Sequence, residues 1–556
     1  MDRSHPSVNM NRYLHPYILA GLVPAVFFIL FYFYPLSGIL VRSFFDGSGL
    51  NMIFLEQFLE SKRMHRIIWF TVWQAGLSTL LTLMAALPCA FVMSHYQFRG
   101  KKLIKTIASI PFVLPAVVVA AALQACFGRH GALLGVTIDS PLALVLIAHL
   151  FYNFSVMLRM ISGFWSSIQG RIREAAIMLG AGPVAVFFHI TLPLLKPVIL
   201  ASSALVFIFC FSSFGIILIL GGPAMSTLEV EIYRQAAHLF NLPLASFLSL
   251  IQIGFTFSLM VVYTSFTRQT ARFLPKAETA HLKEPEKPWE KGIIAASTGF
   301  ILCLCLVPML ALVAKSLIHN GTLSFAFYRA LFENTTGSVF YIPPVHAVQY
   351  SFLFAGAALV IALITGVCAA VFIRFCDRRI GSGWTRFFDP IFMLPLSTSA
   401  VTLGFGIIIT LDRPPLNLRD SILLIPVAHA LVGFPFVVRA ILPALRAIPD
   451  RLGDAAAMLG ASPLKIIQTI DLPLIAKALA AGAIFSFTIS LGEFGATIFT
   501  ARPETPTIPV AIYRFLGQPG AMNYGQAMAI STVLMVVTAI GFVMIENVRA
   551  DNSEGF

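Results

Sequence analysis

The stretch EAAIMLGAGPVAVFFHITLP, from Glu174 to Pro193, returns later in the chain as DAAAMLGASPLKIIQTIDLP, from Asp454 to Pro473. The copies start 280 residues apart (454 − 174), and 10 of their 20 aligned positions are identical. Each contains alanines that favour a helix, followed by glycine and proline, which end one. Because both copies lie between long apolar runs, we interpret them as short helices on a membrane surface, at about 168–182 and 448–462.

Composition places most of this 556-residue chain in a membrane. Hydrophobic residues make up 58%, charged residues make up 11%, and the mean hydropathy is +0.85. A soluble globule carries about 25% charged residues, so this chain has too few to cover a water-exposed surface. The net charge of +13 fits the cytoplasmic loops of a membrane protein. It does not indicate nucleic-acid binding, because no basic face interleaved with aromatic residues lies outside the apolar runs.

Apolar runs of about 20 residues, the length that crosses a bilayer as a helix, recur along the chain. They lie near 17–41, 67–93, 104–127, 141–164, 197–220, 243–266, 292–316, 347–373, 387–410, 421–444, 478–500 and 522–546. These runs are longer than the roughly ten alternating residues of a transmembrane strand. We therefore predict an all-α integral membrane protein of about twelve helices.

The repeat extends over two halves of six helices each. The first half is 1–275, the linker, rich in Lys, Glu and Pro, is 276–291, and the second half is 292–556. At the same offset, Pro115 aligns with Pro395 and His149 with His429. Because an even number of spans returns the chain to the same side, we expect a parallel repeat of one fold.

Lys and Arg decide the orientation, because cytoplasmic loops carry an excess of them. With both termini in the cytoplasm, the basic loops at 99–105 and 374–386 and the linker face the cytoplasm, together with both repeated stretches. Lys62, Arg63 and Arg66 oppose this rule. We predict a multi-pass protein with a cytoplasmic N-terminus and C-terminus.

The spacing Glu-Ala-Ala, three residues, Gly and, after nine intervening residues, Ile-x-Leu-Pro resembles the EAA signature of binding-protein-dependent ABC importer permeases. The resemblance covers both halves and implies a type I ABC importer permease-like fold, whose short helices dock on a cytoplasmic ATPase. The matching residues are Glu174, Ala175, Ala176, Gly180 and Pro193 in the first copy, and Asp454, Ala455, Ala456, Gly460 and Pro473 in the second. Aspartate is shorter than glutamate, so the two sites can couple unequally.

The same resemblance implies the partners and the location. The chain would work in the inner (cytoplasmic) membrane with two copies of the ATPase subunit and with an extracytoplasmic substrate-binding protein. The segment FCFSSFGIILILGGP (Phe209–Pro223) is similar to the thiamine permeases, whereas SLGEFG (Ser490–Gly495) is similar to iron(III), molybdate and sulfate permeases as well. A thiamine importer is therefore favoured, with an iron(III) or other small-ion importer as the alternative.

The sequence offers no motif for chemistry of its own. It has no G-x-x-x-x-G-K-[ST] loop to hold phosphates, and neither H-E-x-x-H nor G-x-S-x-G occurs. We expect no catalytic residue, metal site or cofactor, and ATP hydrolysis on a separate chain. A secondary transporter driven by an ion gradient would also show a parallel repeat, but it gives no reason for two repeated surface helices.

The substrate pathway is predicted in the fifth span of each half. Glu493 lies in an apolar run, and an acid inside the bilayer is costly enough to support a functional hypothesis. A cationic substrate would suit it, and the alternative is a structural acid paired with an Arg or capped by hydroxyls. The candidate gate residues are Ser212, Ser213, Phe214, Ser490, Glu493 and Phe494. His149 and His429 are either ligands or proton relays, or packing residues with satisfied hydrogen bonds.

Overall fold

The chain forms two compact units, each assembled from segments far apart in the sequence. The computed structural model describes residues 10–46, 49–50, 53–128, 135–168, 175–222, 225–272, 282–333, 342–377, 382–412 and 416–553. Unit 1 comprises Met1–Val41, Val345–Ile508 and Ile540–Phe556, and unit 2 comprises Arg42–Pro344 and Pro509–Ala539.

Unit 2 consists of helices and two small hairpins. Its elements are β1 (Phe45–Asp46), β2 (Gly49–Leu50), α3 (Ile53–Glu60), α4 (Lys62–His95), α5 (Lys101–Val113), α6 (Ala116–Phe127), α7 (Pro141–Ser167), α9 (Pro183–Val186), η2 (Phe187–Thr191), α10 (Leu192–Phe211), α11 (Gly215–Leu220), α12 (Leu228–Tyr233), η3 (Arg234–His238), α13 (Leu242–Arg272), α14 (Pro288–Leu317), β3 (Ile318–His319), β4 (Thr322–Leu323) and α15 (Ala326–Arg329). The η elements are π-helical turns, one residue wider than an α-helical turn.

Unit 1 is helical throughout its described part. Its elements are α1 (Met10–Phe28), η1 (Ile29–Phe33), α16 (Pro344–Phe375), α17 (Ser382–Ser397), α18 (Ala400–Thr410), α19 (Leu424–Ala447), α20 (Asp450–Met458), α21 (Pro463–Ile466), η5 (Ile467–Asp471), α22 (Leu472–Leu474), α23 (Ala476–Gly492) and α24 (Thr497–Thr500). Three other helices have residues in both units, namely α2 (Tyr34–Phe44), α25 (Ile508–Leu516) and α26 (Ala521–Ser553), and the first residue of α16, Pro344, also belongs to unit 2.

Among the described residues, nine helices are long and apolar enough to cross a membrane, and three bent helix pairs raise the number to twelve. The pairs are Lys101–Val113 with Ala116–Phe127, bent by 107°, Pro390–Ser397 with Ala400–Thr410, bent by 97°, and Pro463–Leu474 with Ala476–Gly492, bent by 76°. Each span overlaps one apolar run of the sequence. The prediction of an all-α membrane protein with about twelve helices is confirmed.

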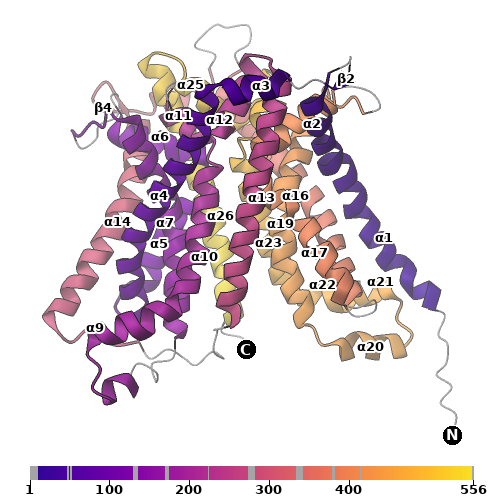
Figure 1. Cartoon of the computed structure of the whole chain (residues 1–556), viewed down its shortest axis with the longest axis horizontal. Coiled ribbons are helices and arrows are strands. Elements are labelled where there is room, and N and C mark those ends of the chain that lie inside the picture. The colour runs from indigo at the N-terminus through magenta and orange to yellow at the C-terminus, as the bar shows by residue number, and fades with distance from the viewer. Residues whose placement is uncertain are drawn as a thin grey trace. The chain divides into compact units, whose positions relative to one another are not determined.

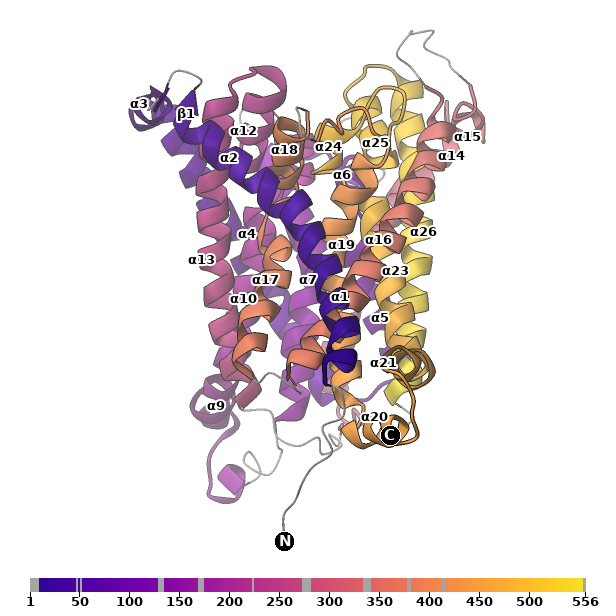
Figure 2. The same cartoon turned by 90° about the vertical axis from the view of Figure 1, so that its right-hand side faces the viewer.

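The first and seventh spans pack mainly with spans from the other half of the sequence. In unit 1, Phe28 and Tyr32 join a core made mainly by α16, α18 and α19, and the Tyr32 hydroxyl bonds the Thr398 hydroxyl at 2.6 Å. In unit 2, Ile301 and Cys305 of α14 join a core made by α4, α5, α7 and α10. Figure 1 shows α1 in indigo beside the orange helices of unit 1, and Figure 2 looks onto it. Each unit therefore contains the first span of the other half of the sequence.

Two of the three bent pairs, α5 with α6 and α17 with α18, correspond at an offset of 284 residues rather than 280. The turn before the break is closed by Leu114 N–H to Pro111 O in α5 and by Thr398 N–H to Pro395 O in α17, both at 3.3 Å. The structural counterpart of Pro395 is thus Pro111 (395 − 111 = 284), and its alignment with Pro115 is wrong. The separation between this proline and the aligned histidine is 38 residues in the first half (149 − 111) and 34 in the second (429 − 395). An ungapped comparison cannot register that shortening.

The two hairpins are antiparallel, with Phe45 opposite Leu50 and Ile318 opposite Leu323. Between β3 and β4, Asn320 has φ 49° and Gly321 has φ 80°. Two successive positive φ values define the tight turn whose twist matches an antiparallel hairpin, and Asn-Gly is its preferred sequence. The hairpin thus turns the chain sharply at the end of α14.

The linker is attached to unit 2 through its backbone. Gln97 N–H donates to Lys283 O and Lys283 N–H donates to His95 O, both at 2.9 Å. α14 then begins at Pro288, where the missing N–H of proline costs no helical hydrogen bond. Glu290 accepts from Lys283 Nζ at 2.7 Å, and this hydrogen bond raises the pKa of the Lys283 amine. These contacts fix the start of α14 four residues before the predicted span at 292 (292 − 288).

Candidate functional site

The repeated stretch ends its helix with the same hydrogen bonds in both copies. In the second repeated turn (residues 455–461), Gly460 has φ 84°, its N–H donates to Ala457 O at 3.0 Å, and Ala461 N–H donates to Ala456 O at 3.0 Å. This pair of bonds is a Schellman motif, which satisfies carbonyls that the last helical turn leaves without partners. The left-handed backbone at its centre favours glycine.

The first repeated turn (residues 175–181) has the same geometry. Gly180 has φ 87°, its N–H donates to Ile177 O at 2.9 Å, and Ala181 N–H donates to Ala176 O at 3.0 Å. Residues 175–178 form one helical turn before it. Glu174 lies outside the described residues. The glycine positions predicted from the sequence therefore act as helix stops in both copies.

The two repeated turns expose the same apolar side chains. Met178 and Leu179 are 88% and 89% exposed, and Met458 and Leu459 have the same values. Ala175 and Ala455 are also exposed, so the helix backbone behind the pair is accessible. Large apolar side chains held away from their own protein are a mark of an interaction surface, and Met adapts easily to a partner. The matched pair was not singled out by the sequence reasoning, which considered the alanines and glycines.

Asp454 is exposed, as a charged contact residue should be. However, α20 begins at Asp450, so Asp454 lies in the middle of the helix and Asp450 occupies the first turn. Ala456 is half-buried, and its carbonyl accepts the hydrogen bond from Ala461 described above. The acid of the second copy therefore faces outward without contributing to the start of the helix.

The Leu-Pro pair of each copy follows a wide helical turn. Leu192 N–H donates to Phe187 O and Leu472 N–H donates to Ile467 O, which are bonds to the fifth residue back. Pro193 and Pro473 come next, are exposed, and have no N–H to continue an α-helical ladder. A π-helical turn at this place gives the proline ring room and still pairs the preceding N–H. η2 and η5 thus lie at the same offset of 280 residues (467 − 187).

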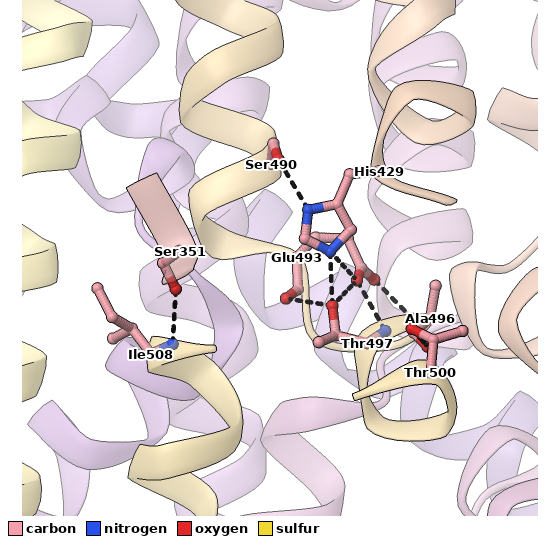
Figure 3. A network of polar contacts seen from close by, with 8 residues as sticks. All are labelled: Ser351, His429, Ser490, Glu493, Ala496, Thr497, Thr500 and Ile508. Carbon is pink, nitrogen blue, oxygen red and sulfur yellow. Dashed lines mark hydrogen bonds and ion pairs between the residues drawn. The ribbon is translucent and has the colours of Figure 1, made fainter. Parts of the chain in front are cut away.

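Glu493 lies where α23 ends, and its carboxylate is fully engaged (Figure 3). It accepts from the backbone N–H groups of Ala496 at 2.8 Å and Thr497 at 2.9 Å, and from the Thr497 hydroxyl at 2.5 Å. His429 Nε2 lies 3.3 Å from the same carboxylate, and His429 Nδ1 contacts the Ser490 hydroxyl at 2.7 Å. The side chain caps the short helix α24 and is only 6% exposed as a residue. This geometry favours the structural alternative for Glu493 in this conformation.

Close backbone packing explains why the loop around Glu493 is rich in glycine. A Cβ added to Gly404 of α18 would lie 2.6 Å from Ala496 Cα, and one added to Gly495 would lie 3.1 Å from Val401 N. α18 therefore contacts this loop through its backbone, and both contacts exclude larger residues. The loop that carries Glu493 thus packs directly on the backbone of α18.

The other candidate gate residues lie at helix ends, not inside the fifth spans. α10 ends at Phe211 and α23 at Gly492, so the predicted spans at 197–220 and 478–500 run too far. The Ser212 hydroxyl donates to Ile208 O at 2.7 Å, and the Phe214 ring packs on Tyr233 at 5.5 Å between centroids. Ser213 and Phe494 are buried. Apolarity alone continues across these breaks, which is why the sequence extended the spans.

His149 is the counterpart of His429 but has different partners. Its Nδ1 contacts the Ser78 hydroxyl at 2.9 Å, while Asn153 Nδ2 donates to Cys210 Sγ at 3.3 Å beside it. Its Nε2 is buried with no hydrogen-bond partner, whereas His429 Nε2 contacts Thr497 and Glu493. The two halves therefore build unlike polar clusters around the same histidine.

Two buried acids escaped the sequence reasoning. Glu229 and Glu231 of α12 are 0% exposed. Glu231 accepts from Arg63 at 3.1 Å and from Gln235 Nε2 at 2.6 Å, and Glu229 accepts from Gln252 Nε2 at 2.9 Å. Arg63 is one of the basic residues that oppose the orientation rule, and its salt bridge gives a structural reason for its position. In the sequence, the position of Arg63 against the predicted orientation was therefore the signal of a buried carboxylate.

Replacing Glu493 by Gln should lower the thermal stability of the purified protein, because one capped acceptor and the contact with His429 are lost. We expect a cost of about 1.5–3 kcal/mol, the range for hydrogen bonds to a charged group. Thermal unfolding in detergent measures the stability, with Ser213→Ala at the equivalent position as the control. An unchanged melting temperature would contradict the capping role, and uptake at wild-type rates would reject a role for Glu493 in the gate.

Replacing Arg63 by Gln should destabilise the protein more than replacing Glu231 by Gln. The first change leaves a buried carboxylate without its cation, whereas the second leaves an arginine side chain that is 46% exposed and can be hydrated. The double variant should be milder than Arg63→Gln alone. Melting temperatures of the three variants test this order: equal losses for both single variants would contradict it, and additive losses in the double variant would refute the pairing.

Comparisons with known proteins identify the family of this chain. The model of the family described as "Binding-protein-dependent transport system inner membrane component" matches residues 78–272 and 362–550. Thiamine transport system permease protein ThiP of Brucella abortus (strain 2308) is 25% identical over 504 residues, 88% of this chain and 89% of that protein. ThiP of Haemophilus influenzae is 24% identical and covers 98% of each chain, and ThiP of Escherichia coli (strain K12) is 23% identical over 87% of this chain and 89% of its own length. The chain belongs to the family of binding-protein-dependent transport system inner membrane components, as a fused permease that carries the family domain twice.

Proposed function

We propose that this permease is the membrane subunit of an ATP-driven importer that takes up thiamine. The two repeated turns would be the docking sites for two copies of one cytoplasmic ATPase chain, with both termini on the same cytoplasmic side. An extracytoplasmic binding protein would deliver the substrate. The observation that carries the proposal is the matched exposure of Met178–Leu179 and Met458–Leu459 at two identically terminated helices.

The matched geometry supports two copies of the same partner. Both turns present methionine and leucine at equal exposure, followed by a glycine with φ near 85° (87° and 84°). A groove that accepts one such turn would accept the other, since the side chains and the helix stop are the same. The difference lies in the acid, which is Asp454 in the second copy and Glu174 in the first. Unequal coupling of the two sites would then arise from the acids and from how each turn is attached to its unit.

Thiamine is favoured as the substrate by the overall sequence similarity and by one local motif. The relatives named above carry thiamine transport in their names and align with this chain over most of its length. The segment Phe209–Pro223 resembles thiamine permeases in the sequence itself. An iron(III) importer is the second candidate, because the motif at Ser490–Gly495 is similar to iron(III) permeases too.

Replacing both Gly180 and Gly460 by Val should uncouple uptake from ATP hydrolysis. A Cβ at either position meets no atom within 4 Å, so the change acts through the positive φ and not through a clash. A residue other than glycine pays roughly 1–2 kcal/mol of conformational free energy to adopt the left-handed backbone. That cost is enough to reshape the exposed turn but not to unfold the protein. Gly182→Ala is the matched control, because Gly182 also has open space, lacks a positive φ, and aligns with Ser462.

The experiment measures substrate uptake, ATP hydrolysis and membrane insertion of the two variants. We expect the double variant to be inserted at normal levels with uptake reduced at least tenfold, and the control to resemble the wild type. Unchanged uptake in the double variant would refute the docking role of the repeated turns.

The substrate is tested by uptake in a strain that lacks this chain. Labelled thiamine and labelled iron(III) are offered separately, before and after the gene is restored. We expect restored thiamine uptake that excess unlabelled thiamine abolishes, with iron(III) uptake unaffected. Restoration of iron(III) uptake alone would replace thiamine by the second candidate.

A further inference from the structure

The two arms that follow the repeated turns join the fifth spans differently. The first arm (residues 183–194) continues into α10, and Val184–Phe211 passes as one span of 28 residues. The second arm (Pro463–Leu474) meets α23 at a bend of 76°, centred on Ile475. A continuous helix transmits a push along its axis, whereas a break does not. The second repeated turn itself lies in unit 1. Its movement therefore cannot pass along the axis of α23 and has to reach the other helices of unit 1 through side contacts.

A buried ion pair provides that route. Arg374, in the last turn of α16, donates to Asp471 Oδ1 of the second arm at 2.7 Å. The two side chains are 9% and 14% exposed, so water screens the pair little. Asp471 is the last residue of η5, and its carbonyl accepts from Ile475 N–H at 3.1 Å. The ion pair thus holds Asp471 of the second arm to α16, one helical turn before the bend at Ile475.

The same arginine also contacts the chain that leads into the second repeated turn. Its second amino group donates to Ile448 O at 3.4 Å, just before α20 begins. A few residues away, Arg446 at the end of α19 pairs with Asp377, which follows α16, at 2.9 Å. The entry and the exit of the second repeated turn are therefore both tied to the end of α16.

The first half has none of these charges at the equivalent positions. Arg374 and Asp471 correspond to Ser94 and Thr191, and Arg446 corresponds to Ser166, all at the offset of 280. Instead the ring of Phe187 in the first arm lies 6.4 Å from Trp165, which lies 5.6 Å from Phe91, so the contact there is aromatic. The ion pair is therefore specific to the half whose arm is bent away from its span.

We propose that the Arg374–Asp471 ion pair is the joint that passes movement of the second repeated turn to α16. In this arrangement the first site acts along its fifth span, and the second acts sideways on α16. Arg374 and Asp471 are positioning residues, because the proposal has them act through the second arm and α16. The inference rests on the proposed function, because it assumes an ATPase that moves the repeated turns. It also explains why the two sites would couple unequally even with the same partner.

Hydrogen exchange of the intact protein in lipid nanodiscs tests the joint without any ATPase. In Arg374→Gln, amides of residues 463–474 should exchange at least tenfold faster, because the arm loses its buried partner. Amides of residues 183–194 in the same molecules are the internal control and should not change. The charge-swapped variant Arg374→Asp with Asp471→Arg should restore slow exchange. Unchanged exchange at 463–474 in Arg374→Gln would overturn the joint.

Transport measurements then test transmission. Asp471→Asn should lower thiamine uptake at least tenfold while the ATPase still co-purifies and hydrolyses ATP, whereas Thr191→Asn at the equivalent position should retain uptake. The charge swap should recover part of the uptake, and the retained ATP hydrolysis of Asp471→Asn separates lost transmission from a folding defect. Wild-type uptake in Asp471→Asn would overturn the inference. If the wild type itself captured no ATPase, the proposed function would fall, and the exchange result would still decide whether the ion pair holds the arm.

Discussion

A helix that stops in or near a bilayer leaves backbone N–H and C=O groups without partners, and in hydrocarbon each such group is costly. The breaks in this protein are built around that cost. Glu493 accepts the free N–H groups at the start of α24, Ser399 accepts from Val401 N–H at the start of α18, and the Schellman bonds at Gly460 serve the carbonyls that end α20. Once these ends are paired, the spans can bend and stop without losing stability.

The same constraint shapes the surface that we assign to docking. The hydrogen bonds at Gly180 and Gly460 use backbone atoms only, so the side chains before each glycine are free to face outward. Met458 and Leu459 then contribute little to the fold, since almost all of their surface is exposed. Apolar residues kept in this state twice, at the same positions, support the proposed docking of a partner.

The two units place chemically different side chains at equivalent positions. Around the aligned histidine, unit 2 places Ser78 and unit 1 places Glu493. Beside the arms, unit 2 uses the rings of Trp165 and Phe187, whereas unit 1 uses the pair of Arg374 and Asp471. Duplicated halves within one chain can diverge in this way because each mutation changes only one of them.

The spans and the helix stops were predictable from the sequence, because apolar length and a glycine before a proline are local signals. The end of α10 at Phe211 was not, since the apolar run resumes at Phe214 after only two serines. Neither was the partner of Arg63, because Glu231 is 168 residues away and only the fold brings the two together (231 − 63 = 168). The packing of α1 and α14 depends on which apolar faces meet, and hydropathy does not distinguish one apolar face from another.

The central claim is that each repeated turn contacts a copy of the same ATPase chain. A photo-crosslinking side chain placed at Leu179 or at Leu459 in intact cells tests it most directly, because both positions are exposed and make no demand on the fold. The account predicts a crosslink from each position to the same ATPase chain, and a control at Ile364 on the exposed side of α16 should give none. Crosslinks to different proteins, or from only one of the two turns, would contradict it.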